Sequence, residues 1–476
     1  MSKSTSLIDR RAFLRGSGQI LAGTALVSSS AGAMAEKASR KMRVALVGTG
    51  IRGIRFWGRD LVQGFSDAVE FVGLCDTNPG RLQFAQDYIG VDCPTFTDID
   101  ALLDSGPIDM VMVTTDDASH DEIIVKALDR NINVITEKPM TTDEHKCTAI
   151  QKAVERSDAE LIMSFNYRYG HMFTSLKEVL DRKEIGDVVS VDFNWYLNTY
   201  HGASYFRRWH GLREKGGTLL LHKSAHHFDL LNWFIESDPV EVSAYGALEH
   251  YGHNNDFRGK NCRECPHQKK CDYYWDITKD ELATKLYVEN EHHDGYIRDN
   301  CLWREEIDIF DKMSVQVRYA NNVIVNYSLT TYSPFEGFRL ALNGKHGRVE
   351  TWEGIPWLEE QETDQSKVYE KEMGLTSHST REEGRHELII AKNFGDYQRI
   401  ELPYIRKAHW GGDPILNAHV FKGIPPERNF GQKANFRDGA MSVLIGVAAR
   451  KSIDEGRPVK IEELTDLKPQ VKRMKA

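Results

Sequence analysis

The feature of this sequence that most constrains its fold is a regular alternation of short apolar runs and helix-like stretches that starts near Met42. Strands of a parallel sheet are buried on both faces, so they are short continuous runs of β-branched residues, and a crossover helix follows each one. We expect strands at 43–48, 69–76, 109–115, 133–137 and 160–165, with helices at 51–63, 81–88, 120–130 and 143–156. This pattern predicts an open, doubly wound parallel sheet with helices on both faces.

From about Asn166 onward the expected strands are longer and have no helices between most of them. A helix near 172–180 leads to strands at 188–196, 241–248, 313–319, 323–330 and 338–343, and a helix at 436–455 closes the pattern. Consecutive strands without crossover helices pair antiparallel. We therefore expect a domain at 36–165 with the parallel sheet and an α+β domain at 166–476 with a large, mostly antiparallel open sheet. A polar, tyrosine-rich stretch at about 250–301 is predicted to be an insertion in the second domain.

A glycine-rich turn, Gly48-x-Gly50-x-x-Gly53, follows the first expected strand. The first glycine allows the tight turn, the second lets the backbone approach a pyrophosphate, and the third lets the helix pack on the strand. Backbone N–H groups at the helix start, at Ile51 and Arg52, are suited to hold the phosphates with help from the helix dipole. Because the turn stands at the head of a parallel sheet, it predicts a dinucleotide site of the Rossmann type.

Asp76 ends the second expected strand and indicates which dinucleotide the site prefers. A carboxylate at this place accepts hydrogen bonds from the ribose hydroxyls of NAD and repels the 2′-phosphate of NADP. We therefore expect NAD as the cofactor. Asp76 could also be a turn residue only, and the neighbouring guanidinium of Arg81 could accept a phosphate, so NADP stays an alternative.

The first 35 residues are typical of an export signal. Arg10 and Arg11 precede Phe13-Leu14, a weakly apolar run follows, and the segment 33–35 suits cleavage after a small residue. This arrangement predicts recognition by the twin-arginine export machinery and a periplasmic location; an amphipathic N-terminal helix is the alternative. The apolar run is too short to span a bilayer, and no later segment reaches transmembrane length.

The amino-acid composition indicates which class of molecule the protein binds. The chain has 476 residues and a net charge of -9. Proteins that bind nucleic acid concentrate Lys and Arg on one face, because they must neutralise phosphates. The sequence therefore argues against a nucleic-acid partner and favours a small-molecule substrate.

Lys138 is a candidate catalytic residue because it follows the fourth expected strand, in Thr136-Glu137-Lys138-Pro139. The carboxyl end of a parallel strand borders the crevice where a nicotinamide binds, so its amine can hydrogen-bond a reacting hydroxyl and help to move its proton.

A second group of candidates lies on a helix expected over 221–234. His222, His226 and Asp229 share one face of it, and Lys223 and His227 form a neighbouring stripe. Two histidines four residues apart could also ligate a metal, and His227 could simply be packed in the core.

The chain resembles the Gfo/Idh/MocA family of sugar and inositol oxidoreductases. The resemblance rests on ordered motifs that extend over nearly the whole chain after the export signal. They are the glycine turn with Glu137-Lys138-Pro139, Cys75–Asn78 with Arg81, Thr114–Asp116 with His120, Asn166–Tyr169, and Gly216–Leu220. In that family an aspartate and, four residues later, a histidine follow the Gly-Gly segment; here these places hold His222 and His226. The missing aspartate leaves open how His226 or the substrate hydroxyl is oriented.

The resemblance also implies roles for individual residues. Thr115, His120, Glu137, Lys138 and Asn166 are expected to contact the cofactor, and Lys138 and His226 to be catalytic, with His226 as the acid/base that relays the proton. The family further implies a homo-oligomer assembled through the open second sheet. Polar and aromatic residues in segments that should face the cleft are expected to grip a carbohydrate; they are Arg168, Tyr169, Arg208, Trp209, His222, Lys223 and His409.

Four of the seven cysteines cluster in the predicted insertion, at positions 262, 265, 271 and 301. Cys262, Cys265, Cys271 and Cys301 could hold a structural zinc, with His267 as an alternative ligand. In an oxidising compartment two disulfides are the competing interpretation. The other three cysteines lie in the first domain, where burial is the expected explanation.

The combined features predict an NAD-dependent oxidoreductase that transfers a hydride between a ring carbon of a sugar, glycoside or cyclitol and a nicotinamide. One alternative is a glycosidase that uses NAD transiently to oxidise the sugar ring, although the relatives that do this lack the lysine found here at 138. Another alternative is a sensor that binds NAD without catalysis. A sensor would not explain why Lys138 and His226 are present, because neither residue would have a catalytic role.

Overall fold

The computed structural model describes residues 40–357, 364–372, 385–403 and 408–472. The predicted export signal, residues 1–35, lies outside them and stays a prediction. In the described part of the chain, we find no helix with both the length and the apolar character needed to cross a membrane.

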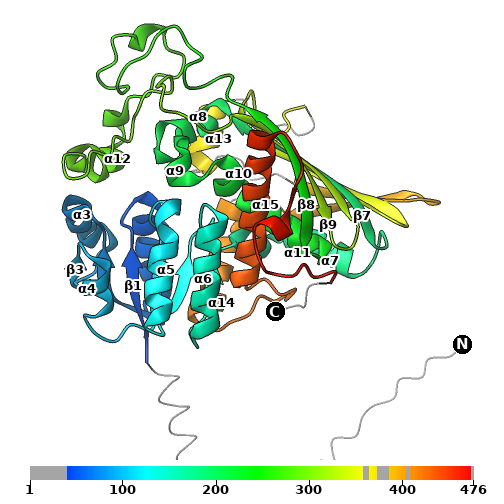
Figure 1. Ribbon diagram of the computed structural model, residues 1–476, viewed down its shortest axis with the longest axis horizontal. Coiled ribbons are helices and arrows are strands. Elements are labelled where there is room, and N and C mark those ends of the chain that lie inside the picture. Colours follow the sequence, from blue (N-terminus) through cyan, green and yellow to red (C-terminus); the bar gives the residue numbers. More distant parts are fainter. Residues whose placement is uncertain (1–39, 358–363, 373–384, 404–407, 473–476) are drawn as a thin grey trace, which may run out of the picture. The chain divides into compact units, whose positions relative to one another are not determined.

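Six parallel strands form the first sheet, in the order β3-β2-β1-β4-β5-β6 (Figure 1). Their bounds are Met42–Val47 (β1), Val69–Cys75 (β2), Thr95–Phe96 (β3), Met110–Val113 (β4), Asn133–Thr136 (β5) and Leu161–Met163 (β6). All of β4 and the last four residues of β1 are buried, because helices cover the sheet on both faces. The predicted doubly wound sheet, a Rossmann fold, is therefore confirmed.

Three helices of this half begin at a residue whose side chain caps them. The helical segments are Gly53–Asp60 (η1, a π-helix), Leu61–Phe65 (α2), Pro79–Ile89 (α3), Ile99–Leu103 (α4), Asp117–Ser119 (η2), His120–Asp129 (α5) and Glu144–Arg156 (α6). The side chain of Asn78 accepts a hydrogen bond from the N–H of Arg81 at the start of α3. Asp143 accepts from two N–H groups at the start of α6. Such caps fix where a helix begins because they satisfy N–H groups that have no partner inside it.

Nine strands form the second sheet, in the order β14-β13-β12-β11-β7-β10-β9-β8-β15. Their bounds are Val188–Asn198 (β7), Pro239–Ala247 (β8), Lys312–Tyr319 (β9), Ile324–Ser333 (β10), Gly337–Gly344 (β11), Gly347–Glu353 (β12), Arg385–Lys392 (β13), Tyr397–Pro403 (β14) and Val459–Lys460 (β15). The pairing of β10 with β7 is parallel, and the other pairs for which a register is defined are antiparallel. The predicted α+β half with a mostly antiparallel sheet is confirmed.

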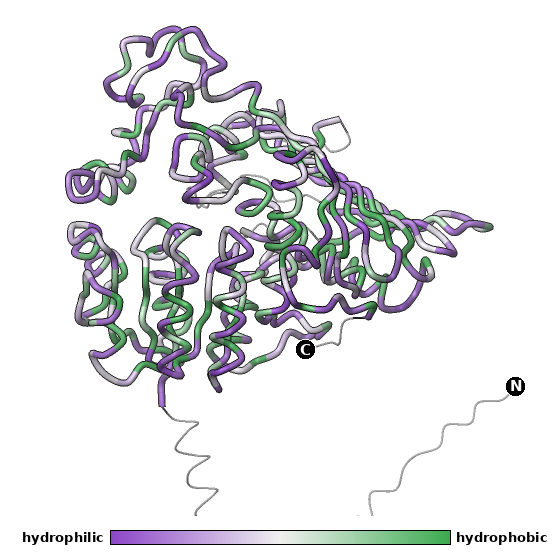
Figure 2. The backbone as a smooth tube through the Cα atoms, viewed as in Figure 1, coloured by the Kyte–Doolittle hydropathy of each residue, from purple (hydrophilic) through white to green (hydrophobic). Residues whose placement is uncertain are grey.

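One face of the second sheet is apolar and the other is polar. Along β9, exposed and buried residues alternate strictly, and Figure 2 shows polar and apolar residues mixed along these long strands. Helices cover the apolar face: Phe173 of α7 (His171–Asp181) stacks on Phe338, and Phe228 of α11 (Ser224–Ile235) contacts Tyr327. Homo-oligomer assembly through the open face stays a prediction.

The long helix α15 (Phe436–Glu455) joins the two halves. It packs on β8 of the second sheet and on β6 of the first. Glycines permit the close approach: a Cβ at Gly446 would lie 2.7 Å from the Leu220 carbonyl oxygen, and one at Gly439 would lie 2.8 Å from Met163 Sδ. The bounds of this helix agree with the sequence prediction.

The connections of the second half contain many short helices that periodicity did not reveal. They are Asn166–Tyr169 (η3), Thr199–Arg207 (α8), Trp209–Gly211 (η4), Arg213–Gly216 (α9), Leu219–His222 (α10), Gln268–Lys270 (η5), Ile277–Lys279 (η6), Glu281–Leu286 (α12), Val288–Asn290 (η7), Gln365–Glu372 (α13), Ala408–Gly411 (η8), Gly412–Phe421 (α14) and Ile461–Glu463 (η9). The single helix expected over 221–234 is in fact two, α10 and α11, which meet at Lys223. In Figure 1 α12 lies next to α3, so the insertion reaches across to the first sheet.

A buried ion cluster fixes α11 and α15 to η3. The guanidinium of Arg168 donates to both carboxylate oxygens of Asp229, at 2.8 Å from Nε and 2.5 Å from Nη2. Its Nη2 also lies 3.0 Å from Asp438 Oδ1, and the three side chains are 3%, 1% and 11% exposed for Arg168, Asp229 and Asp438. Burial alone would lower the pKa of Arg168, but the two carboxylates outweigh it and raise the pKa further above its ordinary value. Arg168 therefore stays charged.

We expect R168M to lower the free energy of unfolding by about 3–5 kcal/mol, because it leaves two buried carboxylates without their cation. Urea denaturation followed by circular dichroism measures this. The matched control is R182M, since the Arg182 side chain is 67% exposed and, within the described part of the chain, forms an ion pair with Glu178 of α7 alone; its loss should stay below about 0.5 kcal/mol. Equal stability of the two variants would contradict a structural role for the cluster.

Candidate active site

A cavity of about 1130 Å³ lies at the carboxyl end of the first sheet. Residues that follow β1, β2, β4 and β5 form one wall, and α8, η4, α10, α11, η8 and the insertion form the other. Crevices at this end of a doubly wound sheet are where such folds bind ligands. Of the predicted site residues, the cavity is lined by Gly48, Gly50, Ile51, Arg52, Asp76, Arg81, Thr115, His120, Glu137, Lys138, Arg208, Trp209, His222, Lys223, His226 and His409.

The glycine turn has the geometry that a dinucleotide requires. Gly48 has a φ of 95°, and a Cβ there would lie 2.6 Å from the backbone of Thr114. A Cβ at Gly53 would lie 2.2 Å from the Gly48 carbonyl oxygen, so this glycine packs helix on strand and does not line the cavity. Only glycine fits at both positions. The turn is thus a cradle in which a phosphate can approach the backbone.

The insertion closes over this cradle. Tyr287 Oη accepts a hydrogen bond from the N–H of Ile51 at 2.8 Å, the donor that a Rossmann turn otherwise offers to a phosphate. Arg81 lies between two carboxylates, 3.0 Å from Asp76 and 2.6 Å from Asp294 of the insertion. The guanidinium of Arg81 is therefore already neutralised inside the protein.

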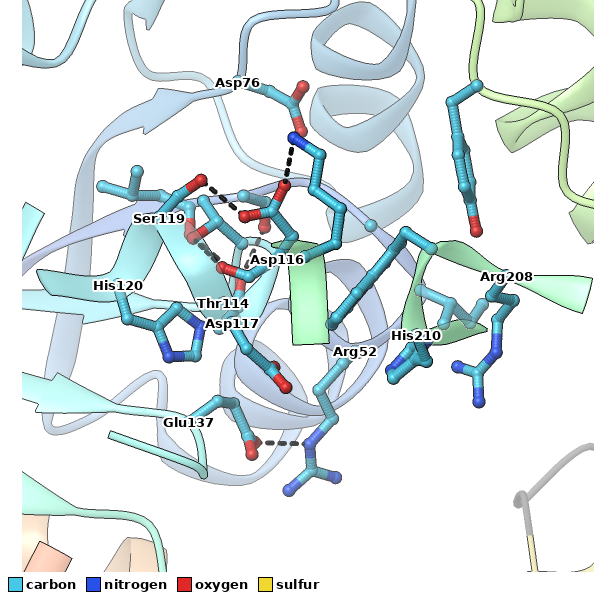
Figure 3. A pocket seen from close by; sticks show the side chains of 18 of the residues that line it. Arg52, Asp76, Thr114, Asp116, Asp117, Ser119, His120, Glu137, Arg208 and His210 are labelled. Carbon is cyan, nitrogen blue, oxygen red and sulfur yellow. Dashed lines mark hydrogen bonds and ion pairs between the residues drawn. The ribbon is translucent and has the colours of Figure 1, made fainter. Parts of the chain in front are cut away.

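Glu137 is held ionised at the end of β5. Its Oε1 accepts hydrogen bonds from Arg52 Nε at 2.6 Å and from Trp57 Nε1 at 2.8 Å, and Figure 3 shows the Arg52 contact. Burial would raise the pKa of Glu137, but the charges of Arg52 and then Lys138 outweigh it, so the pKa is lowered. Glu137 thus fixes the orientation of the Arg52 side chain, which belongs to the segment that follows Gly50 of the glycine turn.

Lys138, His222 and Asp117 form a hydrogen-bonded chain across the cavity. Lys138 Nζ lies 3.3 Å from His222 Nε2 and 3.1 Å from the His222 carbonyl oxygen, and His222 Nδ1 lies 2.6 Å from Asp117 Oδ2. A protonated lysine can only donate, so His222 Nε2 accepts and Nδ1 carries the proton that goes to Asp117. Burial and then the Lys138 charge hold the pKa of His222 well below its ordinary value, which keeps the imidazole neutral. Asp117 therefore supplies a carboxylate beside the position where the family has one.

His226, on α11, lies on the same cavity wall as His222 and opposite the wall that carries Lys138. Its ring stacks on Tyr167 with centroids 4.1 Å apart and planes 4° apart, and among the described residues its Nδ1 has no hydrogen-bond partner. Burial, followed by the charges of Lys138 and His409, holds the pKa of His226 well below its ordinary value. The result is a neutral imidazole that can take up a proton.

Three predicted ligand contacts are corrected by the structure. Arg168, Tyr169 and Asn166 do not line the cavity. Arg168 belongs to the buried ion cluster, Tyr169 Oη bonds to His419 Nδ1 at 3.0 Å, and Asn166 Nδ2 donates to Asp413 Oδ1 at 2.7 Å. Asp413 itself lines the cavity and lies 2.9 Å from His409 Nδ1, so Asn166 acts on the cavity through Asp413.

Sequence reasoning missed several residues of the cavity. Asp117 directly follows the Thr114–Asp116 motif. Its place just after an expected strand could have identified it as a candidate cavity residue. His201 and Tyr205 of α8 lie in a segment without a recognisable pattern. Their side chains bond to each other at 3.2 Å, and His201 Nδ1 lies 3.2 Å from Glu336 Oε1.

The zinc prediction for the insertion is not supported. All seven cysteines have free thiols, and the described residues contain no cluster of His, Cys, Asp and Glu placed to hold a metal. Cys262 Sγ instead accepts from the Arg207 guanidinium at 3.3 Å, and a fixed cation beside a sulfur opposes metal binding. Cys301 Sγ accepts from the backbone N–H of Gly259 at 3.4 Å. These sulfurs stabilise loops.

The fold and the cavity together define a dinucleotide-binding oxidoreductase. Two family models match the chain: "Oxidoreductase family, NAD-binding Rossmann fold" at residues 42–165 and "Oxidoreductase family, C-terminal alpha/beta domain" at residues 177–461. The chain therefore belongs to the Gfo/Idh/MocA family of NAD-binding oxidoreductases, and the resemblance found in the sequence is confirmed.

Individual relatives agree with this assignment. A Bacillus subtilis (strain 168) protein named "Putative oxidoreductase YteT" is 32% identical over 88% of this chain and 98% of its own length. The inositol 2-dehydrogenase of Salmonella typhimurium (strain LT2) is 26% identical over 41% of this chain, and the match spans 56% of that enzyme. The chain thus aligns with only about half the length of that dehydrogenase.

Solved structures show the same fold. A levoglucosan dehydrogenase in complex with NADH and levoglucosan has a TM-score of 0.59 at 14% identity, covering 89% of this chain and 100% of that one. The WlbA dehydrogenase of Bordetella pertussis, in complex with NADH and UDP-GlcNAcA, has a TM-score of 0.58 at 18% identity, covering 88% and 99%. At these identities the likeness concerns the fold.

We expect D117N to lower kcat about 10- to 100-fold, because an amide can donate to His222 Nδ1 and so favours the wrong tautomer opposite Lys138. Steady-state kinetics over a range of pH measures this, and the acid limb of the profile should move with the substitution. D121N, on the nearby helix α5, is the control. If D117N kept the wild-type pH profile and only lowered the free energy of unfolding, Asp117 would have a structural role and not a catalytic one.

Proposed function

We propose that this protein oxidises a hydroxyl-bearing carbon of a sugar, glycoside or cyclitol and passes the hydride to bound NAD. The observation that carries the proposal is that the glycine cradle, Lys138 and His226 line one cavity. Relatives whose names specify inositol and levoglucosan as substrates support the choice of a polyol. When bound, NAD supplies the hydride acceptor.

The chain's own residues position the substrate hydroxyl and move its proton. Lys138, anchored by His222, donates a hydrogen bond to the hydroxyl oxygen. His226 is neutral and accepts the hydroxyl proton as the carbon gives up its hydride. Trp209 lines the cavity and stacks on His210 with centroids 3.5 Å apart, which makes a rigid aromatic surface for a sugar ring.

K138M and H226N should each lower the rate of NADH formation at least 100-fold, because each removes a group that handles the proton. The assay is absorbance of the full chain with NAD and a panel of inositols, hexoses and glycosides, alongside calorimetric measurement of NAD affinity, which should change little. K152M and H145N are matched controls; Lys152 is exposed and the His145 side chain is 91% exposed. Turnover by H226N at the wild-type rate would contradict the mechanism.

The pH profile gives an independent readout. The pKa of His226 lies well below 6.5, so the wild-type rate should stay level as the pH falls to 6.5 and decline only when His226 gains a proton at lower pH. Release of an aglycone without net NADH formation would favour the glycosidase alternative.

The same cavity favours NAD over NADP by at least tenfold in affinity. Asp76 repels a 2′-phosphate, and Arg81 is already paired with Asp76 and Asp294. D294N should improve NADP binding by releasing Arg81, with NAD affinity changed less than threefold, as calorimetry would show. D92N, at an exposed position, is the control. Tighter binding of NADP than NAD by the wild-type protein would refute this preference.

A further inference from the structure

Tyr205 is a cavity residue to which the proposed function gives no role. It lies on α8 and lines the cavity together with His201, four residues earlier on the same helix. The centroid of the Tyr205 ring lies 5.4 Å from that of His222, whose Nε2 lies 3.3 Å from Lys138 Nζ. A substrate hydroxyl that Lys138 holds therefore has Tyr205 as a neighbour.

A chain of hydrogen bonds leads from Tyr205 into the protein. His201 Nε2 lies 3.2 Å from Tyr205 Oη, and His201 Nδ1 lies 3.2 Å from Glu336 Oε1. All three residues are buried. The other oxygen of the carboxylate, Glu336 Oε2, accepts a hydrogen bond at 2.7 Å from the N–H of Asn198, the residue that caps α8. The carboxylate at the end of the chain is thus fixed by the start of the helix that carries Tyr205.

The chemistry of the end group sets the direction of these hydrogen bonds. A carboxylate only accepts, so His201 Nδ1 carries a proton and donates it to Glu336. His201 Nε2 then accepts from the hydroxyl of Tyr205. With its only proton directed at His201, Tyr205 Oη can only accept a hydrogen bond from a ligand in the cavity. If the proton passes to His201, the phenolate oxygen is again an acceptor.

The electrostatic surroundings of Tyr205 support an acceptor. Burial would raise the pKa of Tyr205, but neighbouring groups outweigh it and lower the pKa, His201 first and Lys223 next. Lys138 and Arg208 add to this effect, and the guanidinium of Arg208 lies 5.0 Å from the ring. A phenol oxygen that is stabilised in this way accepts a hydrogen bond more strongly.

We propose that Tyr205 selects a second hydroxyl of the substrate: its Oη accepts a hydrogen bond from the hydroxyl next to the one that Lys138 holds. His201 and Glu336 are positioning residues, because they act on the substrate only through Tyr205. This inference rests on the proposed function and narrows the substrate to a sugar or cyclitol whose hydroxyl beside the oxidised carbon is free. A substrate without a donor at that position leaves the buried oxygen of Tyr205 unpaired, which weakens binding.

Calorimetry on the full, NAD-loaded chain tests this selection. The probes are D-glucose, D-galactose, myo-inositol and analogues in which hydrogen or fluorine replaces one ring hydroxyl. For the wild type, replacement at two adjacent positions should weaken binding at least tenfold. One position is the hydroxyl that Lys138 holds, and the other is the hydroxyl at Tyr205. At the second position fluorine should be no better than hydrogen, because fluorine cannot donate a hydrogen bond.

Y205F removes the acceptor oxygen and keeps the ring. It should abolish the sensitivity at one of the two positions and leave the other unchanged. Y200F is the matched control, since Tyr200 belongs to the same helix but is 49% exposed and does not line the cavity. The control should show both sensitivities of the wild type.

E336Q tests the direction of the hydrogen-bond chain. The N–H of Asn198 still needs an acceptor, so the amide oxygen faces it and the amide NH2 faces His201. His201 then changes tautomer, and the Tyr205 hydroxyl turns its proton to the cavity. E336Q should therefore bind the fluorine analogue nearly as well as the parent sugar. H201N removes the group that accepts the Tyr205 proton, so it should have the same effect and replaces E336Q if that variant does not fold.

The outcomes separate this inference from the function beneath it. Equal sensitivity of the wild type and Y205F at every position overturns selection by Tyr205, even if the sugars are oxidised. Wild-type binding that tolerates fluorine at both positions, or no binding of any probe, also overturns it. Calorimetry measures binding without turnover, so the expected pattern without NADH formation counts against the proposed function alone.

Discussion

The buried ion cluster of Arg168, Asp229 and Asp438 is the constraint on which the geometry of the cavity depends. It joins η3, which follows the last strand of the first sheet, to α11 and to the final long helix. Because η3 also carries Tyr167, whose ring stacks on His226 of α11, fixing these elements fixes the imidazole. A charged cluster can hold such a position firmly, since a displaced helix would leave a charge buried without a partner.

Local rules predicted most of the fold but not the orientation of single polar side chains. The strands of the first sheet and the helix at 436–455 follow from periodicity, and Gly48 and Gly53 follow from steric limits on the backbone. Arg168 and Asn166 sit in a motif that suggested ligand contacts, yet both point to protein partners more than sixty residues away in the sequence. Sequence spacing within a segment contains no information about such distant partners.

The departure of this chain from its family at His222 illustrates the same limit. Sequence alone indicated that an aspartate was missing there, and it left the consequence open. The structure places Asp117 at the far end of the His222 ring, so a carboxylate acts on Lys138 through an imidazole. The two residues are 105 positions apart, and only the folded crevice brings them together. A buried imidazole between a lysine and a carboxylate keeps one defined tautomer, which orients the lysine.

The insertion contributes to the cavity in a way that its cysteine spacing did not indicate. The spacing of the thiols predicted a structural zinc or two disulfides, but Tyr287 and Asp294 are the residues of this segment that act on the cavity. Tyr287 takes the N–H of Ile51, and Asp294 neutralises Arg81, so both act on the cofactor half. The insertion thus sets the charge balance of the cofactor half, because it removes a free cation near the expected ribose site.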